Sequence, residues 1–230
     1  MAVVKLGTGL IYGALDMGFK IICVRPVPNF NRGDTMEYIE LPKPDTVGKM
    51  PLETCITRRR SVRRYINQPL DEAAIGQLAW SGQGITDPVP GRRTAPSAGA
   101  MFPTELYLAT QAGVYRYLPV PHALERISEG DIRSALAKAC LGQGFVRQAP
   151  LSIVIGMNFP HTTGHYGERG KRYVILEAGH IAQNLHLQAI ALGLDSVPVG
   201  AYNDSAVAQA VGLPDGIEPV YIVCIGKAQK

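Results

Sequence analysis

The chain contains 230 residues, of which 46% are hydrophobic and 18% are charged. This balance is typical of a globular protein and excludes a disordered chain, and the length suits one large domain or two small ones with a buried core. The formal net charge of +4 is too small to indicate nucleic-acid binding by itself.

The first residues are apolar but do not fit a membrane segment. Residues 2–24 are interrupted by Lys5, Asp16 and Lys20, whereas a spanning helix needs about 20 residues nearly free of charge. The same charges argue against a secretory signal. The glycines between residues 7 and 13 approach the dinucleotide-binding fingerprint, but their last gap is one residue too long and a proline-rich break follows. We therefore expect neither a membrane segment nor a dinucleotide fold.

The chain divides unevenly. A break rich in Pro, Asn and Gly ends at residue 35. We expect residues 1–35 to be an N-terminal extension of unknown role and residues 36–230 to form one domain, and one hypothesis is that Met36 is the true start. The stretch 41–51 carries three prolines and predicts an extended arm.

Regular structure is expected from Leu52 onward, and its mixture of helices and apolar strands predicts an α+β fold. Asp71 predicts the N-cap of a helix over 72–80 that ends before Gly82. Ser128 with Asp131 resembles a capping box for a helix through residue 140. The other predicted elements are a helix beginning at 52, a loop over 81–101, strands over 105–110, 114–117, 151–157 and 220–225, and a long helix over 171–192.

The predicted helix over 171–192 is the longest helical signal. Apolar or small residues recur along one face of it, and it would span about 33 Å at about 1.5 Å per residue. A helix this long and this apolar predicts either an axis of the core or a contact between subunits.

The cysteines do not form a metal-binding pattern. They are Cys23, Cys55, Cys140 and Cys224. None are two residues apart and no histidine pair completes a zinc motif, so we expect reduced, mostly buried thiols, no metal site and a cytoplasmic protein. His161 and His165 lie four residues apart, but the neighbouring proline and glycines predict a loop there.

Five arginines fall within seven positions in the segment RRRSVRRY at 58–65. Side chains two to four residues apart can converge on one ligand, and the arginine fork matches the oxygens of a phosphate. The run therefore indicates a phosphate site, while a solvated basic face and a nucleic-acid patch remain open alternatives.

Two segments of small residues follow the basic run. In TAPSAGAMFP at 94–103, accessible backbone N–H groups would let a flat ring or a phosphate approach, although an ordinary surface loop is the alternative. In DSVPVGAY at 195–202, Pro198 keeps the preceding residue extended and Gly200 leaves space for a planar group, although a helix-to-strand connection is the alternative. Lys227 follows the last predicted strand and carries no signal alone.

Together these segments resemble the FMN-dependent nitroreductase family, and most closely its SagB-type dehydrogenase branch. The matching pieces are RRSVRRY at 59–65, RRTAPSAGAMFPTELYL at 92–108, YGERGKRYVILEAGHIAQNLHLQAIALGLDSVPVGAY at 166–202 and IGK at 225–227. They follow the order and spacing of the family, and the resemblance covers about residues 37–228.

The resemblance implies an α+β sandwich, with a central antiparallel or mixed sheet flanked by helices, that forms a homodimer through its long helices. It also implies two FMN molecules at the dimer interface, each touched by both chains. Arg59, Ser61 and Arg63 would hold the phosphate and ribityl end or the N1–C2 carbonyl edge of the ring, and Lys227 would join them at the phosphate. The residues implied at the ring are Pro96, Ser97, Ala98 and Gly99 of the partner chain, and Gly200 and Ala201 facing N5.

The implied activity is hydride transfer through flavin N5 between a donor such as NAD(P)H and an organic acceptor. SagB-type relatives instead oxidise azolines of a peptide to azoles, with a Lys–Tyr pair implicated as base. The nearest residues here are Lys171 and Tyr173, with Arg172 between them, so these two are the catalytic candidates. Because no side-chain acid or base stands out, a non-catalytic flavin-binding module remains an alternative. The expected ligand is a small molecule or a peptide, and neither nucleic acid nor a membrane.

Overall fold

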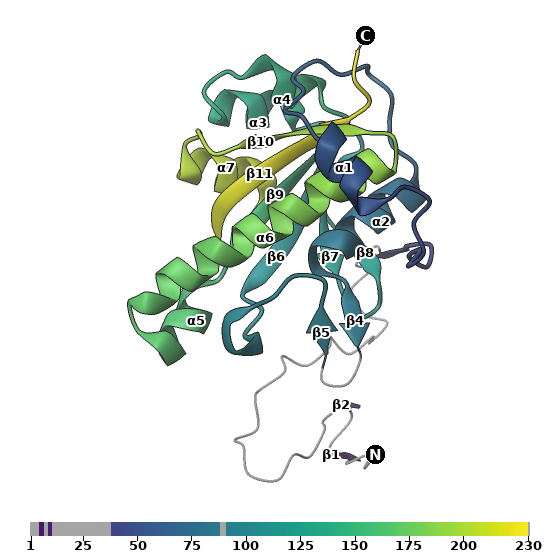
Figure 1. Ribbon diagram of the computed structural model, residues 1–230. Coiled ribbons are helices and arrows are strands. Elements are labelled where there is room, and N and C mark those ends of the chain that lie inside the picture. Colours follow the sequence, from purple (N-terminus) through teal and green to yellow (C-terminus); the bar gives the residue numbers. More distant parts are fainter. Residues whose placement is uncertain (1–4, 7–8, 11–37, 88–90, 230) are drawn as a thin grey trace.

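We analysed a computed structural model that describes residues 5–6, 9–10, 38–87 and 91–229 (Figure 1). The expected boundary at residues 35 and 36, together with Cys23, lies outside the described residues. β1 (Lys5–Leu6) and β2 (Gly9–Leu10) pair with each other in a two-stranded sheet. The domain that carries the sequence motifs begins with β3 (Tyr38–Glu40).

A seven-stranded sheet forms the middle layer of the domain. Its order is β10-β11-β9-β6-β7-β8-β3, and every neighbouring pair is antiparallel. All residues of β9 are buried, as expected of a continuous apolar run that is covered on both faces. Besides β3, the strands are β6 (Thr104–Thr110), β7 (Gly113–Leu118), β8 (Ala123–Glu129), β9 (Leu151–Met157), β10 (Asp195–Val199) and β11 (Glu218–Gly226).

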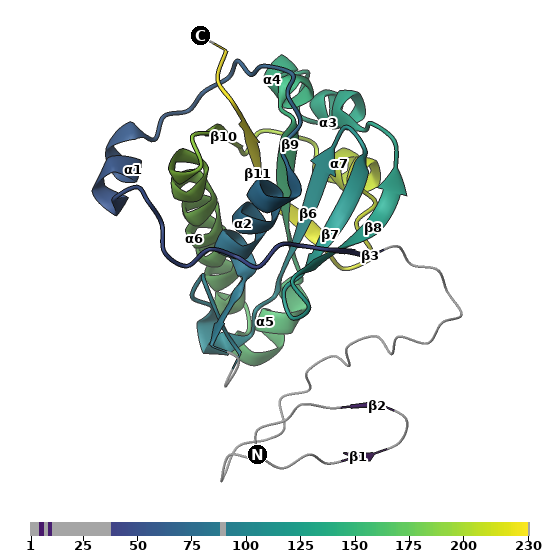
Figure 2. The ribbon, with the colours of Figure 1, turned by 90° about the vertical axis from the view of Figure 1, so that its right-hand side faces the viewer.

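Helices cover both faces of this sheet, which confirms the expected α+β sandwich (Figures 1 and 2). One face is covered by α2 (Glu72–Gln83) and α6 (Arg169–Ala191), and the other by α3 (Arg133–Ala139), α4 (Gly144–Gln148) and α7 (Asp204–Val211). α1 (Leu52–Arg58) lies beyond α6, on the side away from the sheet (Figure 2). The smaller elements are α5 (Phe159–Tyr166), the hairpin of β4 (Ile85–Asp87) and β5 (Arg92–Arg93), and the short helix η1 (Ala98–Ala100).

α6 has one buried side and one exposed side. It contains 23 residues, which corresponds to about 34 Å. Val174, Ile181 and Leu185 are fully buried against the sheet, whereas Ile175 and Leu176 are each 51% exposed. The predicted core axis is therefore confirmed, and the predicted subunit contact stays a prediction.

α2 ends later than predicted, and Gly82 lies within the helix. The start is as expected, because the Asp71 carboxylate accepts a hydrogen bond from the Ala74 N–H at 2.8 Å. The helix continues through Gly82 to Gln83, however, and a Cβ atom at Gly82 would lie 3.0 Å from a methyl group of Leu106. This glycine therefore serves close packing of the helix on β6 and does not end the helix.

The predicted capping box at Ser128 is wrong, because Ser128 lies within β8 and pairs with Val114. Asp131 alone supports the start of α3. Its carboxylate accepts hydrogen bonds from the backbone N–H of Arg133 at 3.0 Å and from the guanidinium of Arg133 at 2.9 and 2.7 Å.

The loop predicted around His161 and His165 is also wrong, since both residues lie in α5. Asn158 caps this helix by accepting from the His161 N–H at 3.1 Å. Pro160 is tolerated because the first turn of a helix leaves its N–H groups unpaired in any case. Both histidines are exposed.

No helix within the described ranges has the length and apolar character needed to cross a membrane.

Candidate functional site

The basic segment at 58–65 is fixed between the edge strand β10 and the tail that follows β11. The backbone N–H of Val62 donates to the carbonyl of Ser196 at 3.0 Å, and that of Ile66 donates to the carbonyl of Lys227 at 3.0 Å. The N–H of Gln229 returns a hydrogen bond to the carbonyl of Arg64 at 3.0 Å. Residues that are more than 130 positions apart in sequence are thus brought together, and the role of the Lys227 ammonium stays a prediction.

The positive charges of this segment form no ion pair with a described acidic residue. Among the described residues, no carboxylate forms an ion pair with any arginine at 58–64 or with Lys227. Arg60 donates to the backbone carbonyls of Thr57 at 2.9 Å and Arg59 at 2.7 Å. The Cζ atom of Arg63 lies 5.8 Å from the ring centre of Phe145. Uncompensated guanidinium groups on an ordered segment favour an anionic ligand.

A buried polar pair supports the same end of β10. The imidazole Nδ1 of His186 lies 2.7 Å from the hydroxyl oxygen of Ser196. Burial, and then the nearby Arg59, lower the pKa of His186 to about 4. The imidazole is therefore neutral at pH 7 and joins α6 to β10 without adding a charge beneath the basic segment.

The segment 94–103 has an unusual backbone. Gly99, Ala100 and Phe102 have φ angles of 59°, 52° and 48°, a left-handed region that is uncommon for residues other than glycine. A Cβ atom at Gly99 would lie 2.6 Å from the hydroxyl oxygen of Tyr166. Pro96 and Gly99 are exposed, and Ser97 and Ala98 are half-buried. The loop presents small residues at the surface, as the sequence predicts.

Gly200 and Ala201 lie just past the last paired residue of β10, Val199, and both are exposed. Within the described residues, the nearest atom to a Cβ built at Gly200 is a ring carbon of Tyr221, at 3.7 Å. The side chain of Gln143 donates to the carbonyl of Ala201 at 2.9 Å. β10 therefore leads from the basic segment at one end to a stretch of bare main chain at the other.

The two catalytic candidates do not converge on a shared point. Lys171 is exposed and its ammonium lies 2.7 Å from the carboxylate of Glu168. Tyr173 packs edge-on against Tyr166, with ring centres 5.2 Å apart, and Tyr166 packs in the same way on His165 at 4.5 Å. Sequence reasoning missed Tyr166, whose neighbours gave no signal that its hydroxyl would meet Gly99.

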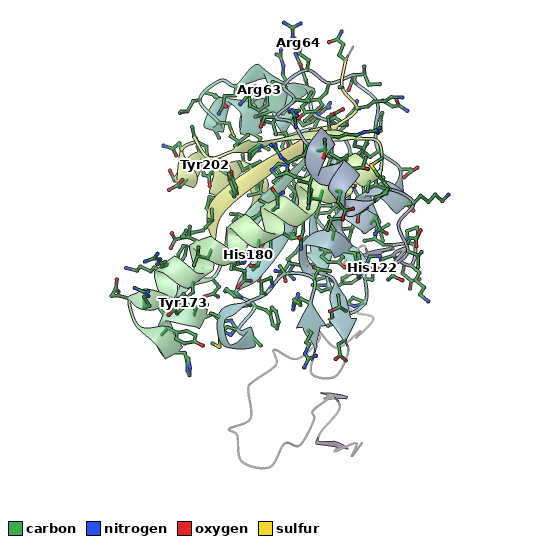
Figure 3. The ribbon with its side chains drawn as sticks, viewed as in Figure 1. Arg63, Arg64, His122, Tyr173, His180 and Tyr202 are labelled. Atoms are coloured by element: carbon green, nitrogen blue, oxygen red, sulfur yellow. The ribbon has the colours of Figure 1, made fainter. Side chains whose placement is uncertain are left out.

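A single chain brings together only some of the residues that the sequence analysis implied for FMN binding. Residues 59–63, Lys227 and β10 meet near His186, whereas the segment 96–99 lies beside Glu177, nine residues earlier on α6. That separation is about 13 Å along the helix. Figure 3 shows Arg63 at one end of the molecule, Tyr173 near the other end, and His180 of α6 between them.

The chain is similar to known proteins over most of its length. The sequence description of the nitroreductase family matches residues 56–227. A nitroreductase-type protein of Methanocaldococcus jannaschii is 38% identical over 201 residues, which cover 85% of this chain and 98% of the relative. The crystal structure of a nitroreductase-type protein from Ralstonia eutropha gives a TM-score of 0.76 at 34% identity and covers 84% of this chain and 90% of that one.

A third match concerns the branch of the family. The microcin B17-processing protein McbC of Escherichia coli is 33% identical over 150 residues, which cover 60% of this chain and 55% of McbC. McbC is a SagB-type relative. The match therefore agrees with the branch that the sequence motifs resemble.

Proposed function

Because the chain belongs to the nitroreductase family, we propose that it is an FMN-dependent oxidoreductase that transfers hydride between a donor such as NAD(P)H and an organic acceptor. The proposal includes a homodimer with FMN at the interface, formed by the domain at 36–230. One observation carries it: five arginines at 58–64 and Lys227 have no acidic partner among the described residues, and they are fixed beside an exposed glycine-containing end of β10.

The residues present suit a group with a phosphate and a flat ring. We propose that Arg59, Ser61 and Arg63 bind the phosphate and ribityl end of FMN, or the N1–C2 carbonyl edge of its ring, and that Lys227 joins them at the phosphate. The space at Gly200 fits a planar group, since Tyr221 is the one described residue that a Cβ there would meet. FMN, when bound, supplies the hydride-accepting centre, and the backbone N–H groups of Gly200 and Ala201 orient toward that centre.

Two features favour an FMN site to which both chains of a dimer contribute. Pro96, Ser97, Ala98 and Gly99 carry small side chains that suit contact with a flat ring, yet they lie away from the basic segment of their own chain. The exposed apolar residues of α6 provide a surface through which a second copy can bring that loop to the ring. The chain then supplies phosphate contacts to one FMN and ring contacts to the other.

The decisive experiment is anaerobic titration of the purified protein. We expect a yellow protein with bound FMN whose visible absorption bleaches on addition of NADH or NADPH and returns on addition of a nitro compound or a quinone. A colourless protein that FMN cannot reconstitute would overturn the proposal. Bound FMN that no donor reduces would favour a flavin-binding module without catalysis.

The similarity to McbC favours a second candidate, oxidation of azolines to azoles in a peptide. In that reaction we propose Lys171 and Tyr173 as the candidates for the proton acceptor. The ammonium of Lys171 lies 2.7 Å from the carboxylate of Glu168, and this pairing raises the pKa of the lysine. Incubation with an azoline-containing peptide and mass spectrometry for a loss of two hydrogens tests the candidate, and a Tyr173→Phe variant that keeps full activity contradicts the assignment of the base to Tyr173.

A further inference from the structure

A buried carboxylate lies beneath the segment 94–103, and neither proposed reaction uses it. Glu177 of α6 is 3% exposed, and the hydroxyl of Thr104 donates to its Oε1 at 2.7 Å. The Ser97 hydroxyl lies beside the same carboxylate. Burial raises the pKa of Glu177, and Ser97, Thr104 and Arg93 oppose this rise by stabilising the charged form.

Arg93 provides an opposite charge near Glu177. Its guanidinium donates to the backbone carbonyl of Gln83 at 3.3 Å and to the side-chain oxygen of Gln83 at 3.1 Å. Its Cζ atom lies 5.0 Å from the ring centre of Phe102. The Gln83 amide nitrogen is close enough to Glu177 to favour its charge, but makes no well-formed hydrogen bond.

The loop is therefore held at three points. Glu177 holds Thr104, directly after the loop, and Phe102, whose N–H donates to the Ser97 hydroxyl oxygen at 2.9 Å, rests on Arg93. At the start of the loop, the side chain of Asn184 donates to the carbonyl of Thr94 at 3.2 Å. Such support is needed, because non-glycine residues with positive φ are strained and persist only where their surroundings hold them.

We propose that Glu177 is a positioning residue for the flavin: its carboxylate, bonded to Thr104 and facing Ser97, fixes the backbone of residues 96–99 against the FMN of the partner subunit. This inference rests on the proposed function. A carboxylate suits the task because both of its oxygens accept hydrogen bonds, so it can face the hydroxyls of Thr104 and Ser97 at once. A glutamine has one acceptor oxygen and would turn a donor toward one of the two.

The variant Glu177→Gln tests the role. We expect it to change the visible absorption spectrum of bound FMN and to weaken FMN binding about tenfold, the effect of about 1.4 kcal/mol. Glu129→Gln is the control for loss of one negative charge, because Glu129 is exposed at the end of β8. The control should leave spectrum and affinity unchanged.

A second variant guards against misfolding. Glu177→Gln leaves Arg93 without its counter-charge, which can strongly destabilise a protein, whereas removing both charges is better tolerated. The double variant Glu177→Gln/Arg93→Gln should therefore fold and show the same spectral change. A wild-type spectrum and wild-type affinity in either folded variant, with only a lower unfolding temperature, would overturn the positioning role.

Mixed dimers test whether the effect crosses to the partner. We expect a dimer of one Glu177→Gln chain and one Arg63→Ala chain to keep one FMN with the wild-type spectrum, because both defects fall on the other site. An altered spectrum for the retained FMN would show that Glu177 acts within its own chain and would overturn the inference. If the wild-type protein binds no FMN, the proposed function itself fails. If the wild-type protein binds FMN and the Glu177→Gln variant behaves like it, only the role of Glu177 fails.

Discussion

At the scale of single residues, two adjacent arginines of the basic segment differ in where their side chains lie. Arg63 lies over the ring of Phe145, and the neighbouring Arg64 extends away from the body of the molecule at its upper end (Figure 3). Both are exposed and have no acidic partner among the described residues. The pair therefore offers a matched comparison of two adjacent positive charges.

We expect Arg63→Ala to weaken FMN binding by about 1–3 kcal/mol, the contribution of a hydrogen bond to a charged group. Arg64→Ala should change it far less, because a distant exposed charge is screened by solvent. Equilibrium dialysis of FMN against each purified variant measures both values. Equal, small effects of the two substitutions would mean that the phosphate is held elsewhere.

Gly200 permits a steric test. Among the described residues, a Cβ atom there would meet Tyr221 alone, at 3.7 Å, so an alanine fits without a clash. We expect Gly200→Ala to weaken FMN binding slightly and Gly200→Val to weaken it about tenfold or more, the effect of at least about 1.4 kcal/mol, because the side chain would occupy the space of the ring. Unfolding temperature and FMN absorbance are measured together. A Gly200→Val protein with wild-type FMN content would contradict the placement of the ring.

At the scale of the elements, sequence patterns predicted what depends on local spacing. The apolar run at 151–157 and the capped helix beginning at residue 72 were confirmed because burial and capping are encoded within a few residues. β8 was missed, and Ser128 misassigned, because partner strands select between a strand and a helix start. The contact of Tyr166 with Gly99 joins segments 67 residues apart, and no local pattern encodes it.

The contact of His186 in α6 with Ser196 in β10 predicts that the stability of the protein depends on pH. His186 has its pKa lowered to about 4 in the folded protein, against about 6.5 when unfolded. Between these two pH values, His186 is protonated in the unfolded chain and neutral in the folded chain. This histidine therefore makes the folded protein less stable as the pH falls from about 6.5 to about 4. The full effect is about 3 kcal/mol.

Urea unfolding at pH 7.5 and pH 5 measures this effect. We expect His186→Gln to lose less stability than the wild type between the two values, since glutamine does not titrate and can still bond to Ser196. Carboxylates contribute equally in both proteins, so the difference between them isolates the imidazole. Identical losses would show that His186 is not the group responsible.

At the scale of the whole molecule, α1 and α6 each carry exposed apolar residues. Leu52 and Ile56 of α1 are 58% and 55% exposed, and Ile175 and Leu176 of α6 are each 51% exposed. A cavity of about 940 Å³ separates α1 and the arm at 42–50 from α2 and the C-terminal half of α6. An apolar surface of this kind is typical of an interface between subunits.

We expect Leu176→Asp to convert the proposed dimer to a monomer, because a carboxylate buried in an apolar interface loses its hydration without gaining a partner. The dissociation constant of the dimer should rise about 100-fold, the effect of about 3 kcal/mol. Val120→Asp is the control, since Val120 is 65% exposed in the turn between β7 and β8, away from α1 and α6. Light scattering coupled to size-exclusion chromatography gives the mass, and absorbance gives the FMN content of each peak.

The two readouts of that experiment test different parts of the proposed assembly. If each FMN is completed by the loop at 96–99 of the other chain, the Leu176→Asp monomer keeps its arginines but loses the ring contacts, so it should elute without FMN. A monomer that retains FMN with wild-type affinity would mean that one chain holds the cofactor alone. A variant that stays dimeric would instead mean that the subunits meet elsewhere, and the exposed side of α6 would then require another partner.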